Sequence, residues 1–117
     1  MRMIYGKISD YKQTKNWISG SFFSKESVSY DENVEIKVDY FNESTSFEKH
    51  YHKTRKTWTI VIAGGMHMII DGKALHIKAG EFVIYEPGIN EELLGTDPGT
   101  VTVSIHSPSG LQDKIEE

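Results

Sequence analysis

The sequence contains no cysteine and only three prolines among its 117 residues. Without cysteine, neither a disulfide framework nor a thiolate metal site can form, so histidine and carboxylate side chains would have to hold any metal. Long apolar runs are also absent, and the polar segment at residues 1–13 lacks the apolar stretch that a signal peptide requires. We therefore expect a cytoplasmic protein that does not enter the membrane.

Positive charge is scarce as well, since 13 lysines and arginines accompany 17 acidic residues and give a formal net charge of −4. The basic residues are scattered among the acids and form no stripe that could follow a phosphate backbone. Nucleic acid is therefore not an expected partner. The length is typical of one domain and is sufficient to bury a modest core, so we expect residues 1–117 to form a single domain.

Helical periodicity is almost missing, because residues 112–117 alone carry a helical pattern and are too few to form a stable helix. Short segments that alternate polar with apolar residues, or are rich in β-branched and aromatic residues, recur between turn signals instead. This pattern is typical of an all-β sandwich or barrel. The predicted strands are residues 21–30, 34–41, 47–52, 57–62, 66–70, 74–77, 82–85 and 101–106.

Turn residues separate these strands. Residues 31–33 should join the first two strands as an antiparallel hairpin, and Asp71-Gly72 between apolar runs is a strong signal for a tight hairpin turn. Gly64 and Gly65 end the strand at residues 57–62.

His50 and His52 are separated by one residue within a predicted strand. Their side chains should project from the same face, about 6–7 Å apart at their α-carbons, because strand residues alternate between faces. Two imidazoles in this position can both bind a divalent ion at about 2.0–2.1 Å. The pattern alone is a weak signal and is more often produced by surface histidines, so the spacing of the residues around it is needed to identify a site.

That spacing resembles the first motif of the cupin superfamily, which reads His-x-His, three or four residues, Glu, six residues, Gly. His50, His52 and Gly64 match this motif, and its acid position falls on Thr57. The family's second motif reads Gly, five residues, Pro-x-Gly, two residues, His, three residues, Asn.

The second motif is matched only in part. Gly80 and Gly88 are in register, whereas Glu86 replaces the proline, Glu91 replaces the histidine and Gly95 replaces the asparagine. The resemblance nevertheless covers about residues 45–108. It implies an all-β fold, a single double-stranded β-helix (jelly-roll) barrel of the cupin type.

The resemblance also implies a metal site that departs from the family pattern. In the family, the two histidines, the acid and the later histidine commonly bind a divalent ion. Thr57 is a poor ligand because its hydroxyl is neutral, whereas Glu91 supplies a carboxylate. His50, His52 and Glu91 are therefore the expected ligands of Zn, Mn, Fe or Ni, with open positions for substrate or oxygen.

Three functions fit these residues. The first is a metal-dependent, oxygenase-like enzyme, and the second is an isomerase or epimerase in which His50, His52 and Glu91 perform acid–base work, as in some metal-free cupins. Both would act on a sugar or another polar metabolite. The alternative is a non-catalytic ligand-binding or sensor cupin, which Thr57 favours. Separately, the alternative to a site role for Glu91 is a solvated charge beside Glu92 in a loop. We expect a small-molecule enzyme.

Other polar residues are weaker candidates. His67 and His76 should face outward if the methionines beside them point into the barrel, while His106 can face either way. Arg55 and Lys56 could hold a phosphate at the pocket mouth, although charges in a turn are usually solvated.

An apolar stripe predicts a homodimer. Trp58, Ile60 and Ile62 lie opposite the pocket-facing positions of their strand and need a cover. A second copy of the chain is the expected cover. The N-terminal residues Trp17 and Ile18 are the alternative, if they fold back over the stripe.

Overall fold

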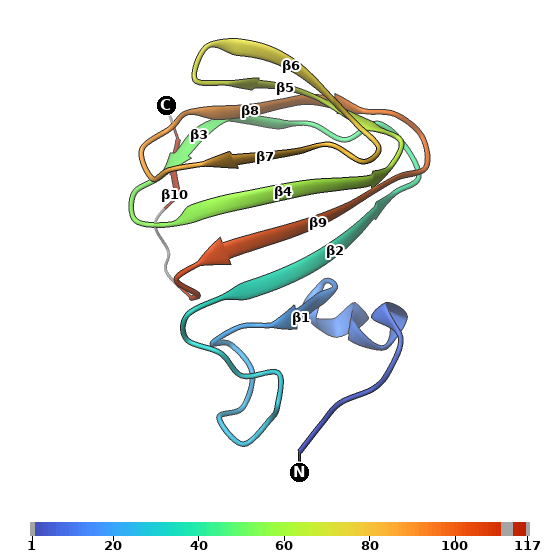
Figure 1. The fold of residues 1–117 in the computed structure, drawn as a ribbon, viewed down its shortest axis with the longest axis vertical. Coiled ribbons are helices and arrows are strands. Elements are labelled where there is room, and N and C mark those ends of the chain that lie inside the picture. Colours follow the sequence, from blue (N-terminus) through green and yellow to red (C-terminus); the bar gives the residue numbers. More distant parts are fainter. Residues whose placement is uncertain (1, 111–113, 117) are drawn as a thin grey trace.

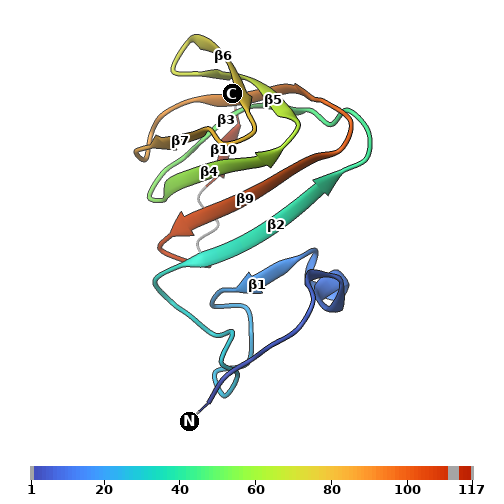
Figure 2. The same ribbon diagram turned by 45° about the vertical axis from the view of Figure 1, so that its right-hand side comes forward.

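The computed structural model describes residues 2–110 and 114–116. Two five-stranded antiparallel sheets pack against each other as a jelly roll, which confirms the expected fold class (Figures 1 and 2). In spatial order, the first sheet contains β1 (Trp17–Ser19), β2 (Glu35–Phe41), β9 (Thr100–Ser107), β4 (Lys56–Ala63) and β7 (Phe82–Tyr85). The second contains β10 (Lys114–Glu116), β3 (Phe47–His52), β8 (Glu91–Thr96), β5 (Gly65–Ile70) and β6 (Lys73–Lys78).

Most strands lie where their sequence pattern predicts them. β3 and β7 begin and end at the predicted residues. β2 and β5 differ from the prediction by one residue at their first position, and β4, β6 and β9 differ by one residue at both ends. Asp71 and Gly72 both have positive φ, 52° and 75°, as a two-residue turn of type I′ requires. β4 and β5 join at Gly64, where φ is 71°.

The strand predicted at residues 21–30 is wrong. This segment is a series of turns, in which the Ser29 N–H donates to the Ser27 hydroxyl and the Tyr30 N–H donates to the Ser27 carbonyl, both at 3.1 Å. Serine side chains that bond to nearby backbone compete with a strand ladder. The expected hairpin is therefore absent, and β2 pairs with β1 and β9 instead.

Four elements were not predicted from the sequence. They are β1, β8, β10 and a 3₁₀ helix, η1 (Ile8–Thr14). β8 was missed because glutamates and glycine have low β propensity. β10 pairs with β3 within the segment that carried a helical pattern, whereas residues 112, 113 and 117 of that segment lie outside the described residues. No helix in the described part of the chain is both long and apolar enough to span a membrane.

The hydrophobic core fills part of the space between the sheets. It consists of Val61, Met66, Met68, Ile70, Ile77, Tyr85 and Leu93. Met66 and Met68 point inward, as expected, and the His67 and His76 side chains face outward, where they are 45% and 41% exposed.

The outer surface of the first sheet carries an uncovered apolar patch, which we call the outer apolar face. It consists of Trp58, Ile60 and Ile62 of β4 with Phe82 and Ile84 of β7. Ile62 and Phe82 are 57% and 64% exposed. Trp17 does not cover this face, because it lines the cavity on the other side of the sheet.

Candidate active site

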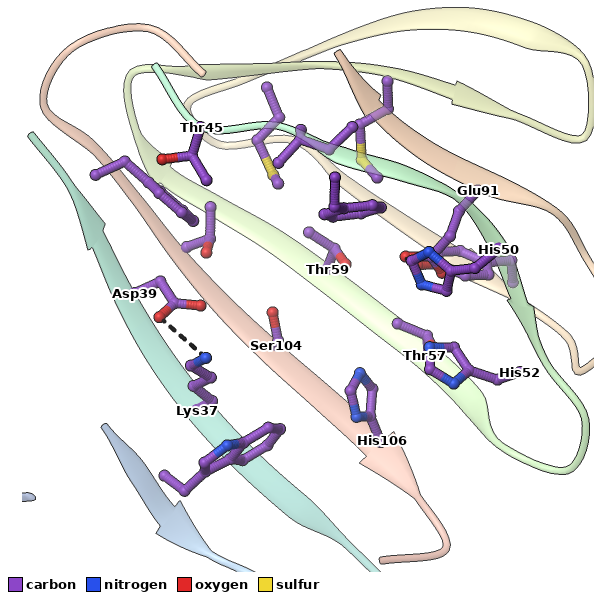
Figure 3. A pocket seen from close by; sticks show the side chains of 18 residues that line it. Lys37, Asp39, Thr45, His50, His52, Thr57, Thr59, Glu91, Ser104 and His106 are labelled. Atoms are coloured by element: carbon purple, nitrogen blue, oxygen red, sulfur yellow. Dashed lines mark ion pairs between the residues drawn. The ribbon is translucent and has the colours of Figure 1, made fainter. Parts of the chain in front are cut away.

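A cavity of ≈ 410 Å³ lies between the two sheets, within the usual size range for small-molecule sites (Figure 3). One end holds three imidazoles and a carboxylate, and the other end holds Lys37 and Asp39. The apolar part of the wall is formed by Phe41, Phe47, Met66, Met68 and Leu93. The cavity therefore combines an apolar wall with two polar ends.

His50 and Glu91 face each other across adjacent strands. They are directly opposite in the β3–β8 register, and His50 Nε2 lies 3.4 Å from Glu91 Oε1. Both side chains are more than nine-tenths buried. Glu91 is thus a cavity residue, and the interpretation of it as a solvated loop charge is wrong.

The proton positions on His50 follow from its neighbours. Its Nδ1 lies 2.9 Å from the Glu48 carbonyl oxygen, which can only accept, so Nδ1 carries a hydrogen. The other nitrogen, Nε2, then meets the Glu91 carboxylate either as a lone pair or as a second N–H. The facing carboxylate stabilises the form with a hydrogen or a metal ion on Nε2, so Nε2 is the nitrogen at which His50 gains or releases a proton.

The pKa of Glu91 reflects opposing effects. Burial raises it, but the hydrogen-bond donors His50 and Tyr85 and the charge of the imidazoles outweigh burial and lower the pKa below its ordinary value. Burial and the neighbouring Glu91 raise the pKa of Tyr85, so its phenol stays protonated. Glu91 Oε2 is buried without a hydrogen-bond partner among the described residues.

His52 is held by Arg55, whose Nη2 lies 3.2 Å from His52 Nδ1. A guanidinium only donates, so His52 Nδ1 accepts and a neutral His52 carries its proton on Nε2. Arg55 also forms an ion pair with Glu35 at 2.8 Å. The sequence suggested a solvated or phosphate-binding Arg55, but the Arg55 side chain is mostly buried and paired with Glu35.

Glu35 lies at the centre of a buried network that the sequence analysis missed. Its Oε2 accepts from Arg55 and lies 2.9 Å from His106 Nδ1, while its Oε1 accepts from the Ser109 hydroxyl and the Gly110 N–H. Burial raises the pKa of Glu35, but these partners outweigh burial and lower it. The network fixes His106 in the cavity wall and Arg55 beside His52.

Aromatic rings form a row along the cavity. Ring centroids are 4.9 Å apart for Phe47 and His50, 5.2 Å for His50 and His52, 5.6 Å for His52 and His106, and 5.7 Å for His106 and Trp17. The sequence left the direction of His106 open, and the structure places it inward. The sequence does carry one signal for this direction. Glu35, Lys37 and Asp39 alternate along β2 and so share one face, and Glu35 lies opposite His106 in the register with β9.

Thr57 lines the cavity where the motif alignment expects an acid. It lies opposite Tyr85 on β7 and His106 on β9, and it is 3% exposed. Its hydroxyl oxygen has no hydrogen-bond partner among the described residues. The position is therefore inside the site but carries no charge.

Comparison with known proteins identifies the family, since the model described as "Cupin domain" matches residues 39–105, more than half of the chain. This chain belongs to the cupin family. A search of curated proteins finds no match.

Solved structures show the same cupin fold at low identity. A conserved protein with a double-stranded β-helix domain from Klebsiella pneumoniae is 18% identical, with a TM-score of 0.68 and 99% of each chain covered. KdgF from Halomonas sp. is 12% identical, with a TM-score of 0.63, covering 68% of this chain and 73% of that one. The WlaRB TDP-quinovose 3,4-ketoisomerase of Campylobacter jejuni is 13% identical, with a TM-score of 0.62 and coverage of 70% and 68%.

The cupin family implies a metal, and the residues fit one in part. The ligand atoms of His50, His52 and Glu91 all lie within 4.8 Å of one another. His50 Nε2 and the unpartnered Glu91 Oε2 suit a divalent ion. His52 does not suit a divalent ion in its present hydrogen bonding, because Arg55 donates to His52 Nδ1 and the neutral ring carries its proton on Nε2.

Proposed function

We propose that this cupin is an enzyme that transfers protons on a polar, sugar-like metabolite, in an isomerisation or epimerisation. The observation that carries the proposal is the buried pair of His50 Nε2 and Glu91 Oε1, in which the Glu48 carbonyl fixes the imidazole. An imidazole titrates in the physiological range, and a neighbouring carboxylate stabilises its charged form. Arg55 bonded to His52 favours this metal-free use of the site.

The chemical step would be proton abstraction beside a carbonyl group. His50 starts in its neutral form, with its hydrogen on Nδ1, and its Nε2 lone pair takes the proton as the C–H bond breaks. The electron pair of that bond forms a C=C bond while negative charge develops on the carbonyl oxygen. Glu91 stabilises the imidazolium that forms. The Nε2–H of His52 donates a hydrogen bond to the oxyanion, and return of the proton to another carbon or face completes the reaction.

The rest of the cavity suits a ligand with several hydroxyl groups. Lys37 and Asp39 lie 3.4 Å apart, and burial raises the pKa of Asp39 while Lys37 lowers it in part. Thr59, Thr102 and Ser104 add hydroxyl groups that donate and accept. The ketoisomerase name of one similar structure supports the same reaction class.

Deuterium exchange tests this proposal without knowledge of the product. The protein is incubated in D₂O with free keto and aldo sugars, uronates and nucleotide-linked keto sugars, and carbon-bound deuterium is followed by NMR. One class should exchange, and His50→Gln should slow it by about 10²–10⁴-fold, the usual contribution of general acid–base catalysis.

A matched control is available on the same strand. Tyr51→Phe changes a side chain on the opposite face of β3, so exchange should continue at the wild-type rate. A sugar that raises the melting temperature but exchanges no hydrogen in the wild type would overturn the enzyme proposal in favour of a binding protein.

A divalent-metal enzyme is the second candidate, favoured by the buried, unpartnered Glu91 Oε2. His50, His52 and Glu91 would hold the ion, which would supply a Lewis acid. Elemental analysis of untagged, unchelated protein decides between the candidates, using a His76→Gln background to remove a surface histidine. Near-stoichiometric metal that His50→Ala or His52→Ala removes would replace the metal-free proposal.

Thr57→Glu should strengthen metal binding in the cavity, because it adds an anionic oxygen where the family has its acid. We expect affinity to rise on the order of tenfold or more, since even outer-shell partners change metal affinity by about 10- to 100-fold. Competition with a chelator measures this. Unchanged affinity in a folded variant would show that Thr57 is not a lost ligand position.

A further inference from the structure

A second histidine cluster lies outside the cavity, and we call it the surface cluster. His67 of β5 and His76 of β6 are directly opposite in the hairpin register, with ring centroids 4.0 Å apart and planes 13° from parallel. Asp97 follows β8 in the turn before β9. Its two oxygens lie 3.1 Å from His67 Nε2 and 3.3 Å from His76 Nε2.

These distances match those between the ligands of a metal ion. Zinc bonds of about 2.0–2.1 Å place neighbouring donor atoms of a tetrahedron about 3.3 Å apart. The observed separations of 3.1 and 3.3 Å are close to this value, although each runs to a different oxygen of Asp97. One ligand atom from each of the three residues lies within 4.8 Å of the other two. Two imidazoles with one carboxylate are a common zinc donor set that leaves a position for water.

The backbone holds Asp97 in place for this role. Its N–H donates to the Gly65 carbonyl at 2.9 Å, and its own carbonyl accepts from the buried Thr100 hydroxyl at 2.6 Å. Gly65 leaves room for the cluster, because a β-carbon there would lie 2.7 Å from His76 Nε2 and 2.8 Å from Asp97 Oδ2. The three ligands are therefore positioned by strand register and a fixed turn, and little chain entropy would be lost on binding.

The surface cluster is separate from the cavity. Glu91 begins β8, whereas Asp97 follows its last residue, so the two sites lie at opposite ends of this strand. Six residues of strand correspond to about 20 Å. His67 also faces away from the cavity, since its neighbours Met66 and Met68 point inward.

We propose that His67, His76 and Asp97 form a divalent transition-metal site of the zinc class, which clamps the β5–β6 hairpin to the turn between β8 and β9. The ion binds the folded chain, in which the three ligands meet, and so it raises the melting temperature with its concentration.

Titration of chelator-treated, untagged protein with Zn²⁺ alone tests the site. Histidine side-chain NMR should show Zn²⁺ shifting the ring signals of His67 and His76. His76→Gln and Asp97→Asn should each weaken this binding by at least about tenfold, given the 10- to 100-fold effect of lesser metal-site changes. His50→Gln should leave the affinity of the surface cluster unchanged.

Two results would overturn the proposal. One is Zn²⁺ that shifts only the cavity histidines, and the other is equal affinity in the wild type and in folded Asp97→Asn. Melting temperatures without metal identify any variant that fails to fold. Deuterium exchange reports on the cavity, whereas this titration reports on the surface cluster, so the two proposals fail independently.

Discussion

Glu35→Ala should lower the free energy of unfolding by about 3–5 kcal/mol, the usual effect of removing one partner from a buried ion pair. Glu35 is 3% exposed, and its carboxylate is bonded to Arg55 in the turn before β4, to His106 of β9 and to Gly110 after β9. Its loss removes the buried ion pair that Glu35 forms with the Arg55 guanidinium. Urea unfolding at neutral pH measures the change.

The pH dependence gives a second readout for Glu35. A carboxyl whose pKa is lowered on folding stabilises the protein above its ordinary pKa of 4.5, and this contribution disappears as the pH falls toward the lowered folded-state value. The difference between wild type and variant should therefore shrink below pH 4.5. Glu86→Ala, at an exposed position, is the control and should change stability by less than about 0.5 kcal/mol. Equal stability of Glu35→Ala and wild type at neutral pH would contradict the network's role.

Sedimentation equilibrium at micromolar concentration should show a homodimer, twice the 13.3 kDa chain, and Ile60→Glu should dissociate it. The outer apolar face would otherwise remain in water. Burying an apolar side chain is worth about 1.5–3 kcal/mol, so several together help to overcome the entropic cost of association. Charge at Ile60, in the middle of that face, opposes this burial.

Two further variants make the dimer test specific. Ile62 is 57% exposed within one chain, so Ile62→Glu should dissociate the dimer with little effect on folding. Leu94 is 51% exposed on the other sheet, and Leu94→Glu should leave the dimer intact. A wild-type species of 13.3 kDa would contradict the prediction. Trp17 could not be the residue that covers the outer apolar face in such a monomer, because it lines the cavity on the other side of the sheet.

The strands could be predicted because their side chains alternate with the period of a sheet that has an apolar and a polar face. Thr57, Thr59 and Val61 point inward, while Trp58 and Ile60 point outward. The same reasoning failed at residues 21–30, where alternation is present but serine hydroxyls bond to the local backbone. The alternation of side chains alone does not show whether a segment has a neighbouring strand to pair with.

The candidate site could be predicted only where motif spacing applied. That spacing placed His50, His52 and Glu91 together, and the structure brings them together, although their role is still a prediction. It could not show the bonds of Glu35 to Arg55 and His106, which lie 20 and 71 residues away along the chain. Such contacts depend on how β2, β9 and the turn before β4 meet in three dimensions.

Gly64 shows what the glycine that ends the first motif does here. Its φ of 71° favours glycine, and a β-carbon there would collide with the Thr100 hydroxyl and lie 2.7 Å from the Thr100 backbone. Thr100 is itself fully buried, and its hydroxyl oxygen accepts a hydrogen bond from the Gly65 N–H at 3.0 Å. This glycine is therefore a fixed point at which the chain between β4 and β5 packs closely against the first residue of β9, and it is not a flexible hinge.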